Sequence, residues 1–326
     1  MENGSVAAFG ERIIDNVSRV LVGKRAEIEL CVIALLSRGH VLIEDVPGVG
    51  KTMLAKSVAR SLSCSFERLQ FTPDLLPADV TGVNIYTPNT QRFEFRHGPI
   101  FAQIVLADEI NRATPKTQSA LLESMEERQV TVDGTTYPLP QPFMVLATQN
   151  PVEFAGTFPL PEAQVDRFLM RVHLGYLDVS NEVQVMDRFQ RESPMEHLEP
   201  VATAEEVVQS QKAVQEVHVD EQLRDYIARL THRTRSHADV SLGSSSRGAL
   251  GLFRSGQARA ALEDRDFVTP DDVKALALPV LAHRLILKPN AELRGLTGPK
   301  LIAQILESEP APPLSVVPRL GRRVAR

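Results

Sequence analysis

One segment of the chain has the residue types and spacing of a phosphate-binding loop. It reads Asp45-Val46-Pro47-Gly48-Val49-Gly50-Lys51-Thr52, after an apolar run at 40–43 and before an apolar stripe with helical spacing. Glycines let backbone N–H groups turn toward a polyphosphate, and the helix that follows directs its positive end at the same anion. In this order Lys51 would contact the β- and γ-phosphates, and Thr52 would hold Mg²⁺.

The first position of this segment departs from the general loop pattern. Asp45 stands where the pattern has glycine, whereas Gly48, Gly50, Lys51 and Thr52 are intact. The alternative interpretation is a chance glycine-rich turn before a helix. The strand and helix on either side favour the phosphate loop.

A pair of acidic residues follows a second apolar run, at 104–107. The run is continuous and not alternating, which is typical of a buried parallel strand. Ligands of open α/β sheets bind at the carboxyl ends of the strands, where Asp108 and Glu109 would lie. Asp108 would contact Mg²⁺ directly or through water, and Glu109 would activate the attacking water. The alternative is that Asp108 and Glu109 are ordinary solvent-exposed residues at the end of a strand.

Three further polar residues are weaker candidates when each is taken alone. Asn150 ends another apolar run, at 143–147, and could hold the lytic water or the γ-phosphate, although a lone asparagine is more often a turn residue. Arg167 follows Asp166 and could be a plain surface ion pair. Arg247 stands at a helix start, where a solvated arginine is common.

The pattern of elements predicts an α/β fold in which five parallel strands have helices on both faces. The expected strands are centred on Val41, Leu69, Val105, Val145 and Leu169. Hairpins are predicted at 83–95 and at 130–137, the latter around the turn signal Asp133-Gly134.

Helical stripes dominate from about residue 177. Helix starts are expected behind Thr114, Asp220 and Thr269 and at Ser246, and Pro279 is expected to end or kink its helix. We therefore predict a nucleotide-binding core at 1–177, a smaller all-α lid at 178–309, and a disordered tail rich in proline and arginine at 310–326.

Composition narrows the classes of protein. The 326 residues carry 36 basic and 41 acidic side chains, so the net charge is −5. This net charge does not indicate a nucleic-acid-binding protein. The chain has no apolar signal core and no run long enough to span a bilayer. Cys31 and Cys64 show no zinc-like spacing and fit a reducing compartment. The sequence predicts a soluble, cytoplasmic protein.

These motifs together resemble those of the MoxR family of AAA+ ATPases, over roughly Ile13 to Leu306. The signatures are Glu44–Thr52, Gln70–Pro77 and Asp108–Ala113, and Asp45 looks normal for this family. The resemblance implies a P-loop NTPase (AAA+) sheet, ATP and Mg²⁺ as cofactors, and ATP hydrolysis. It also implies that the two hairpins are insertions of this branch.

The resemblance implies roles by position. Lys51 and Thr52 look like Walker A, with Pro47, Gly48, Val49, Gly50 and Met53 also at the nucleotide; Asp108 and Glu109 look like Walker B, and Asn150 like sensor 1. Arg167 looks like an arginine finger for the neighbouring subunit, with Arg171 as the fallback. Arg247 looks like sensor 2, and Val22-Gly23 like the segment that lines the adenine.

Members of the resembled family form rings, often hexamers, and act as chaperone-like remodellers. Partners bearing a von Willebrand factor A domain are frequent. Two alternatives stay open, a nucleic-acid translocase and a metal-insertion ATPase subunit of the same insertion-bearing group. The charge disfavours the first, and no metal-ligand cluster in the sequence supports metal binding by this chain.

Overall fold

Five parallel strands form the central sheet, in the order β2-β5-β8-β1-β9. In this computed structural model, which describes residues 5–150, 156–190 and 194–313, the strands are β1 (Val41–Glu44), β2 (Phe66–Gln70), β5 (Ile104–Asp108), β8 (Met144–Gln149) and β9 (Met170–Val172). The five predicted strands and their parallel arrangement are confirmed. The strand that carries Asp108 pairs in parallel with β8, and β8 pairs in parallel with β1.

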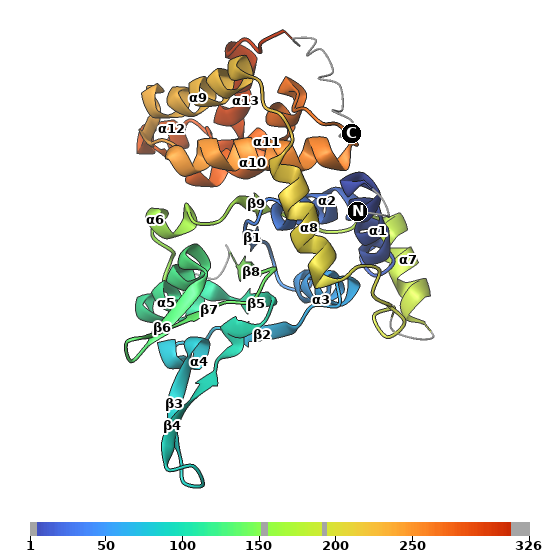
Figure 1. The fold of residues 1–326 in the computed structure, drawn as a ribbon. Helices are drawn as coiled ribbons and strands as arrows, with labels where there is room; N and C mark the ends of the chain where they lie inside the picture. Colours follow the sequence, from blue (N-terminus) through green and yellow to red (C-terminus); the bar gives the residue numbers. More distant parts are fainter. Residues whose placement is uncertain (1–4, 151–155, 191–193, 314–326) are drawn as a thin grey trace, which may run out of the picture.

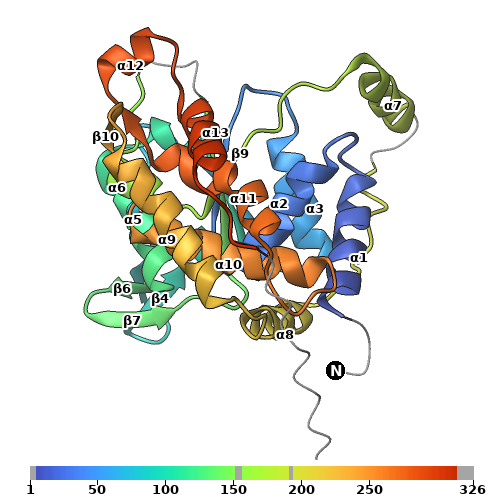
Figure 2. The ribbon, with the colours of Figure 1, turned by 90° about the horizontal axis from the view of Figure 1, so that it is seen from above.

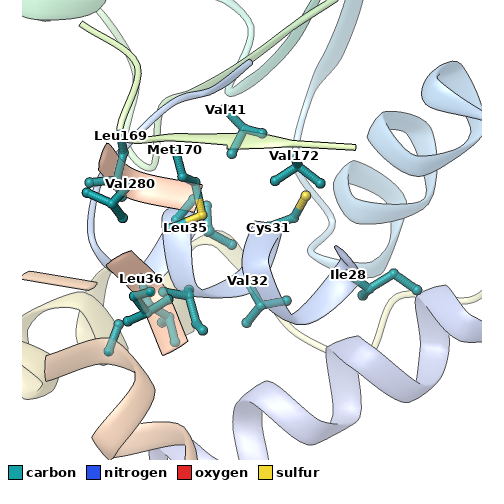
Figure 3. Close-up of a cluster of buried hydrophobic side chains, with 14 of the residues drawn as sticks. Ile28, Cys31, Val32, Leu35, Leu36, Val41, Leu169, Met170, Val172 and Val280 are labelled. Atoms are coloured by element: carbon teal, nitrogen blue, oxygen red, sulfur yellow. The ribbon is translucent and has the colours of Figure 1, made fainter. Parts of the chain in front are cut away.

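Alternate side chains of the sheet enter two separate cores. Val41 and Ile43 pack with α1 (Val6–Ser18), α2 (Arg25–Leu36) and α3 (Lys51–Ser61). Leu42, between them, packs on the opposite face with α4 (Pro77–Thr81) and α5 (Pro115–Glu127). Figure 3 shows the first core, where one face of α2 meets β1, β9 and Val280. Both faces are covered, which explains the continuous apolar runs in the sequence.

Two antiparallel hairpins leave the core, as predicted. β3 (Gly82–Thr87) pairs with β4 (Arg92–His97), and β6 (Gln129–Val132) pairs with β7 (Thr135–Pro138). Asp133 and Gly134 both have positive φ, the conformation of a two-residue type I′ turn. The β3–β4 hairpin projects far from the body of the molecule (Figure 1).

The second half of the chain is mostly helical. Its helices are α6 (Glu162–Val165), α7 (Val179–Phe189), α8 (Ala204–Gln215), α9 (Glu221–Ser236), α10 (Ser246–Leu262), α11 (Pro270–Leu281), α12 (Pro289–Leu293) and α13 (Gly298–Ser308), with short strands β10 (Val240–Leu242) and β11 (Ile286–Leu287). Helices α9 to α13 stack above the sheet, and α7 stands apart from them (Figures 1 and 2). Within the described ranges, no helix is long and apolar enough to cross a membrane.

Most predicted helix starts are found, with three differences in detail. Asp220 and Thr269 accept backbone hydrogen bonds at the starts of α9 and α11, but Thr114 makes no such side-chain cap. Helix α11 does not end at Pro279, because that proline lies in its last turn and the helix continues to Leu281. Helix α8 and the short helix α4 were not predicted. Most of the expected tail lies outside the described residues, although Ala311 packs against the core.

Candidate active site

Most of the candidate phosphate-binding and catalytic residues lie together at the carboxyl ends of three neighbouring strands. Because β5, β8 and β1 are adjacent and parallel, their carboxyl ends share one edge of the sheet. The phosphate loop follows β1, Asp108 ends β5, and Asn150 directly follows β8. Asp45 N–H donates to the carbonyl of Gln149 at 3.1 Å, which fixes the loop beside the end of β8.

The phosphate loop has the shape that its glycines require. Gly48 and Gly50 have φ of 87° and 97°, and a Cβ on either would meet nothing within 4 Å. Lys51 Nζ donates to the carbonyls of Asp45 at 2.8 Å and Val46 at 3.3 Å, so the ammonium group lies against the loop. Gly50 caps α3 and leaves the N–H groups of its first turn for an anion.

The residues present fit a nucleotide with its magnesium ion. The loop opens toward the start of α3 and supplies a cation and helix N–H groups for phosphate oxygens. The Thr52 hydroxyl and the Asp108 carboxylate are oxygen ligands of the type that Mg²⁺ prefers. Across the described ranges, no cluster of three or more His, Cys, Asp or Glu side chains could hold a metal ion by itself.

Asp45 has a structural reason to replace glycine. Its side chain is buried and accepts the N–H of Val46 at 2.9 Å and the N–H of Gly175 at 2.6 Å. Gly175 belongs to the segment that joins β9 to α7. A glycine at position 45 would leave both N–H groups without this acceptor, so the departure from the general pattern ties the loop to that connection.

Thr148 is a site residue that the sequence did not reveal. Its hydroxyl donates to Asp108 Oδ1 at 2.5 Å and accepts the N–H of Glu109 at 2.9 Å. Thr148 is fully buried on β8, whereas the Arg68 guanidinium contacts the other carboxylate oxygen of Asp108 from β2 at 2.6 Å. In the sequence, the one feature that could have indicated Thr148 is its position directly after the apolar run at 143–147, two residues before Asn150.

Glu109 is held away from a straight strand continuation. Its φ is 56°, in the left-handed region, and its Oε2 accepts from Gln70 Nε2 at 2.9 Å and Arg112 Nη1 at 3.0 Å. Gln70 ends β2 and belongs to a signature segment, but no local sequence pattern predicts its contact with Glu109. The carboxylate of Glu109 therefore has two donors, which it would have to leave or share in order to contact a water molecule.

Arg167 lies at the opposite edge of the sheet. The N–H of Leu169 donates to the carbonyl of His40, just before β1, so Arg167 stands near the amino end of that strand. His40 and Asp45 bracket the four residues of β1, and a strand of this length separates them by roughly 16 Å. That separation is longer than an arginine side chain, so Arg167 does not reach the phosphate loop of its own chain.

Arg247 joins Arg167 at this opposite edge. Arg167 Nε lies 3.0 Å from Glu126 Oε2, and Arg247 pairs with the other oxygen of the same carboxylate. Arg247 Nη1 also lies 3.5 Å from Asp166 Oδ2. The fallback residue Arg171 instead pairs with Glu44 at the end of β1, at 2.9 Å. The structure thus places Arg167 and Arg247 together, and Arg171 apart from them.

The expected adenine segment packs on the start of α7. Gly23 has a φ of 70°, and a Cβ there would lie 2.6 Å from Asn181 Nδ2. Lys24, next along the chain, is buried and donates to the carbonyls of Leu174 and Tyr176. The connection between β9 and α7 is therefore hydrogen-bonded to Lys24, beside the predicted adenine segment, and to the phosphate loop.

Comparisons with known proteins agree with this geometry. Residues 40–170 match the model of the ATPase family associated with various cellular activities (AAA), and residues 232–305 match an AAA lid domain. The chain is 50% identical to the protein YeaC of Bacillus subtilis over 92% of this chain and 94% of that protein. It is 38% identical to the chaperone MoxR1 of Mycobacterium tuberculosis, over 96% and 85%. A solved structure from Cytophaga hutchinsonii superposes with a TM-score of 0.88 at 40% identity, over 94% and 97%.

Proposed function

Since the chain belongs to the MoxR family of AAA+ ATPases and hydrolyses ATP, we propose that it works as a ring that remodels partner proteins. In this proposal residues 1–177 form the nucleotide-binding core and 178–309 the lid. A hexamer is the expected ring, and a protein with a von Willebrand factor A domain is the expected kind of partner.

The observation that carries the proposal is the separation of the arginines from the phosphate loop. Lys51, Asp108, Glu109 and Asn150 stand at the carboxyl edge of the sheet, whereas Arg167 and its companion Arg247 stand at the amino edge. A complete site for phosphoryl transfer then needs the amino edge of one subunit against the carboxyl edge of the next. Closed repetition of this heterologous contact gives a ring.

The chemistry divides between the two edges. When bound, Mg²⁺ would neutralise phosphate charge, with Thr52 and Asp108 as its protein ligands. Lys51 would hold the β- and γ-phosphates, Glu109 would accept the proton of the attacking water, and Asn150 would orient that water. Arg167 and Arg247 would stabilise the charge that develops on the neighbour's γ-phosphate.

The β3–β4 hairpin supports work on a protein client. Phe93 is 72% exposed and Tyr86 is 50% exposed, and the two rings contact each other at the outer part of the hairpin. Exposed aromatic side chains on a projecting element are typical of a protein-binding surface. The same hairpin disfavours a nucleic-acid track, because Glu94 lies between Arg92 and Arg96 and binds two threonine hydroxyls.

Two variants of the phosphate site test the proposal directly. Lys51→Ala is expected to lose ATP binding, whereas Glu109→Gln is expected to bind ATP and barely cleave it, because Glu109 acts in the chemical step. Affinity capture with Glu109→Gln in ATP should retain a ring and its client, and Lys51→Ala is the matched control. Equal loss of ATP affinity in both variants, or equal capture by both, would contradict the proposal.

A further inference from the structure

A cavity lined by arginines lies between the core and the lid. Its larger part, of about 530 Å³, and an adjoining part of about 300 Å³ share Ser37, Arg38, Arg128 and Arg254. The walls come from the ends of α2 and α5 and from α8 and α10, of which α10 lies above the sheet (Figure 1). This volume is in the range of small-molecule sites, and the cavity lies at the sheet edge opposite the phosphate loop.

The positive charge of the larger part is not balanced by carboxylates. None of its lining residues is acidic, and the side chains of Arg38 and Arg254 make no hydrogen bond or ion pair with the described parts of the chain. In the smaller part, the carboxylates of Glu126 and Asp166 are already paired with other arginines. The chain as a whole has a net charge of −5, so this local excess is a property of the cavity.

Helix ends offset only part of this charge. The half-buried Arg128 guanidinium donates to the carbonyl of Arg38, just beyond the end of α2, and so has a capping role. Burial, together with the charges of Arg38 and Arg254, lowers the pKa of Arg128 to about 10. The carboxyl ends of α2 and α5 each supply about half a negative charge, which leaves about two of the three positive charges without a counterpart.

We propose that this cavity is a binding site for a small phosphate-bearing molecule, separate from the nucleotide site. The guanidinium groups of Arg38, Arg128 and Arg254 would hold the phosphate oxygens, a contact for which the planar fork of arginine is well suited. Leu36, Val214 and Phe253 offer an apolar wall for the rest of the ligand. Because core and lid both line the cavity, a bound ligand would fix the lid against the core.

Pyrophosphate is a suitable probe, and the Lys51→Ala chain removes the lysine of the phosphate loop. Isothermal titration should show one pyrophosphate bound per Lys51→Ala chain. Adding Arg38→Gln and Arg254→Gln should weaken this binding at least tenfold, while adding Arg224→Gln on the exposed face of α9 should leave it unchanged. Affinity should also fall with salt, because the contact is ionic.

Two results would overturn the proposal. The first is no pyrophosphate binding by Lys51→Ala, and the second is equal affinity with and without the Arg38 and Arg254 substitutions. If self-association weakens in the second case, the cavity wall is instead a contact between copies of the chain. Arg38→Lys with Arg254→Lys guards against a folding defect, because the retained charges should recover part of the affinity. The pyrophosphate titrations do not measure ATP hydrolysis, so this proposal can fail while the proposed ring and the role of Arg167 stand.

Discussion

Arg167 Nε lies 3.0 Å from Glu126 Oε2, at the edge of the sheet opposite the phosphate loop. Arg247 pairs with the second oxygen of that carboxylate, so one glutamate at the end of α5 holds both arginines. All three side chains are partly exposed, so a neighbouring molecule could contact them. The two arginines are thereby positioned as a pair before any neighbour is present.

Thr148→Val is expected to slow ATP hydrolysis while ATP affinity stays near that of the unaltered chain. Valine keeps the shape of threonine but removes the hydroxyl that contacts Asp108 and the N–H of Glu109. The loss of these two hydrogen bonds would misplace Asp108 and Glu109 and should cost on the order of tenfold in kcat. A coupled ATPase assay with a nucleotide-binding titration measures both quantities. Thr148→Ser retains the hydroxyl and should stay active, and full activity of Thr148→Val would contradict the assigned role.

Asp45→Ala is expected to destabilise the chain by about 1–2 kcal/mol, because the N–H groups of Val46 and Gly175 lose their acceptor. Urea denaturation with and without ATP measures this, and nucleotide affinity should fall as well, since the loop loses its link to the segment after β9. Asp187→Ala, at an exposed aspartate of α7, is the matched control. If Asp45→Ala were as stable as the parent chain, the link would have no energetic role.

The sequence predicted the elements better than the contacts between them. Continuous apolar runs identified β1, β5 and β8, because these central strands are covered on both faces and their side chains are buried. The edge strand β2 has no such run and is mostly exposed. The spacing of glycine and lysine located the phosphate loop, because all residues of that motif lie in one short segment of the sequence. Thr148, Gln70 and the hydrogen bond from Gly175 to Asp45 depend on which strand ends are neighbours. The order of the strands in the sheet is a tertiary property, and no local sequence pattern predicts it.

The helix boundaries show the same division. Capping residues predicted the starts of α9 and α11, where the side chain bonds its own helix. Helix α8 also has a capping box, from Thr203 to Glu206, but its apolar stripe is weak because Gln211 and Ser210 fill buried positions. Gln211 donates to the carbonyl of Leu35, a contact with α2 that only the folded chain defines.

Stability should fall as the pH falls below about 6.5, in part through His40. This imidazole is buried; it accepts the N–H of Val145 at Nδ1, and its Nε2 lies 3.1 Å from the carbonyl of Met125. Burial lowers its pKa to about 3, and the nearby Arg128 acts in the same direction. In the unfolded chain this histidine has a pKa of about 6.5 and binds a proton below that pH, whereas in the folded chain it stays neutral down to about pH 3. The free energy of unfolding therefore falls by about 1.4 kcal/mol per pH unit between these values.

Urea denaturation at pH 7.5, 6.5, 5.5 and 5.0 measures this slope. The buried His283, whose pKa is also lowered by burial, should contribute to the slope with the same sign. His40→Gln is expected to be less stable at pH 7.5 and to lose one histidine's share of the slope. The same pH dependence in His40→Gln and in the unaltered chain would show that His40 does not stay neutral in the folded state.

The arginine finger acting between subunits is tested most directly by mixing two inactive variants. Arg167→Ala should bind ATP nearly normally and turn over on the order of 10³-fold more slowly, because the neighbour's γ-phosphate loses its arginine. Glu109→Gln should also be slow, for the separate reason that its own water is not activated. A mixed contact can pair an intact Glu109 with an intact Arg167, so the mixture should regain activity that neither variant has. If the mixture stays as inactive as its components, and specific activity is constant on dilution of the unaltered chain, Arg167 does not act on a neighbouring subunit.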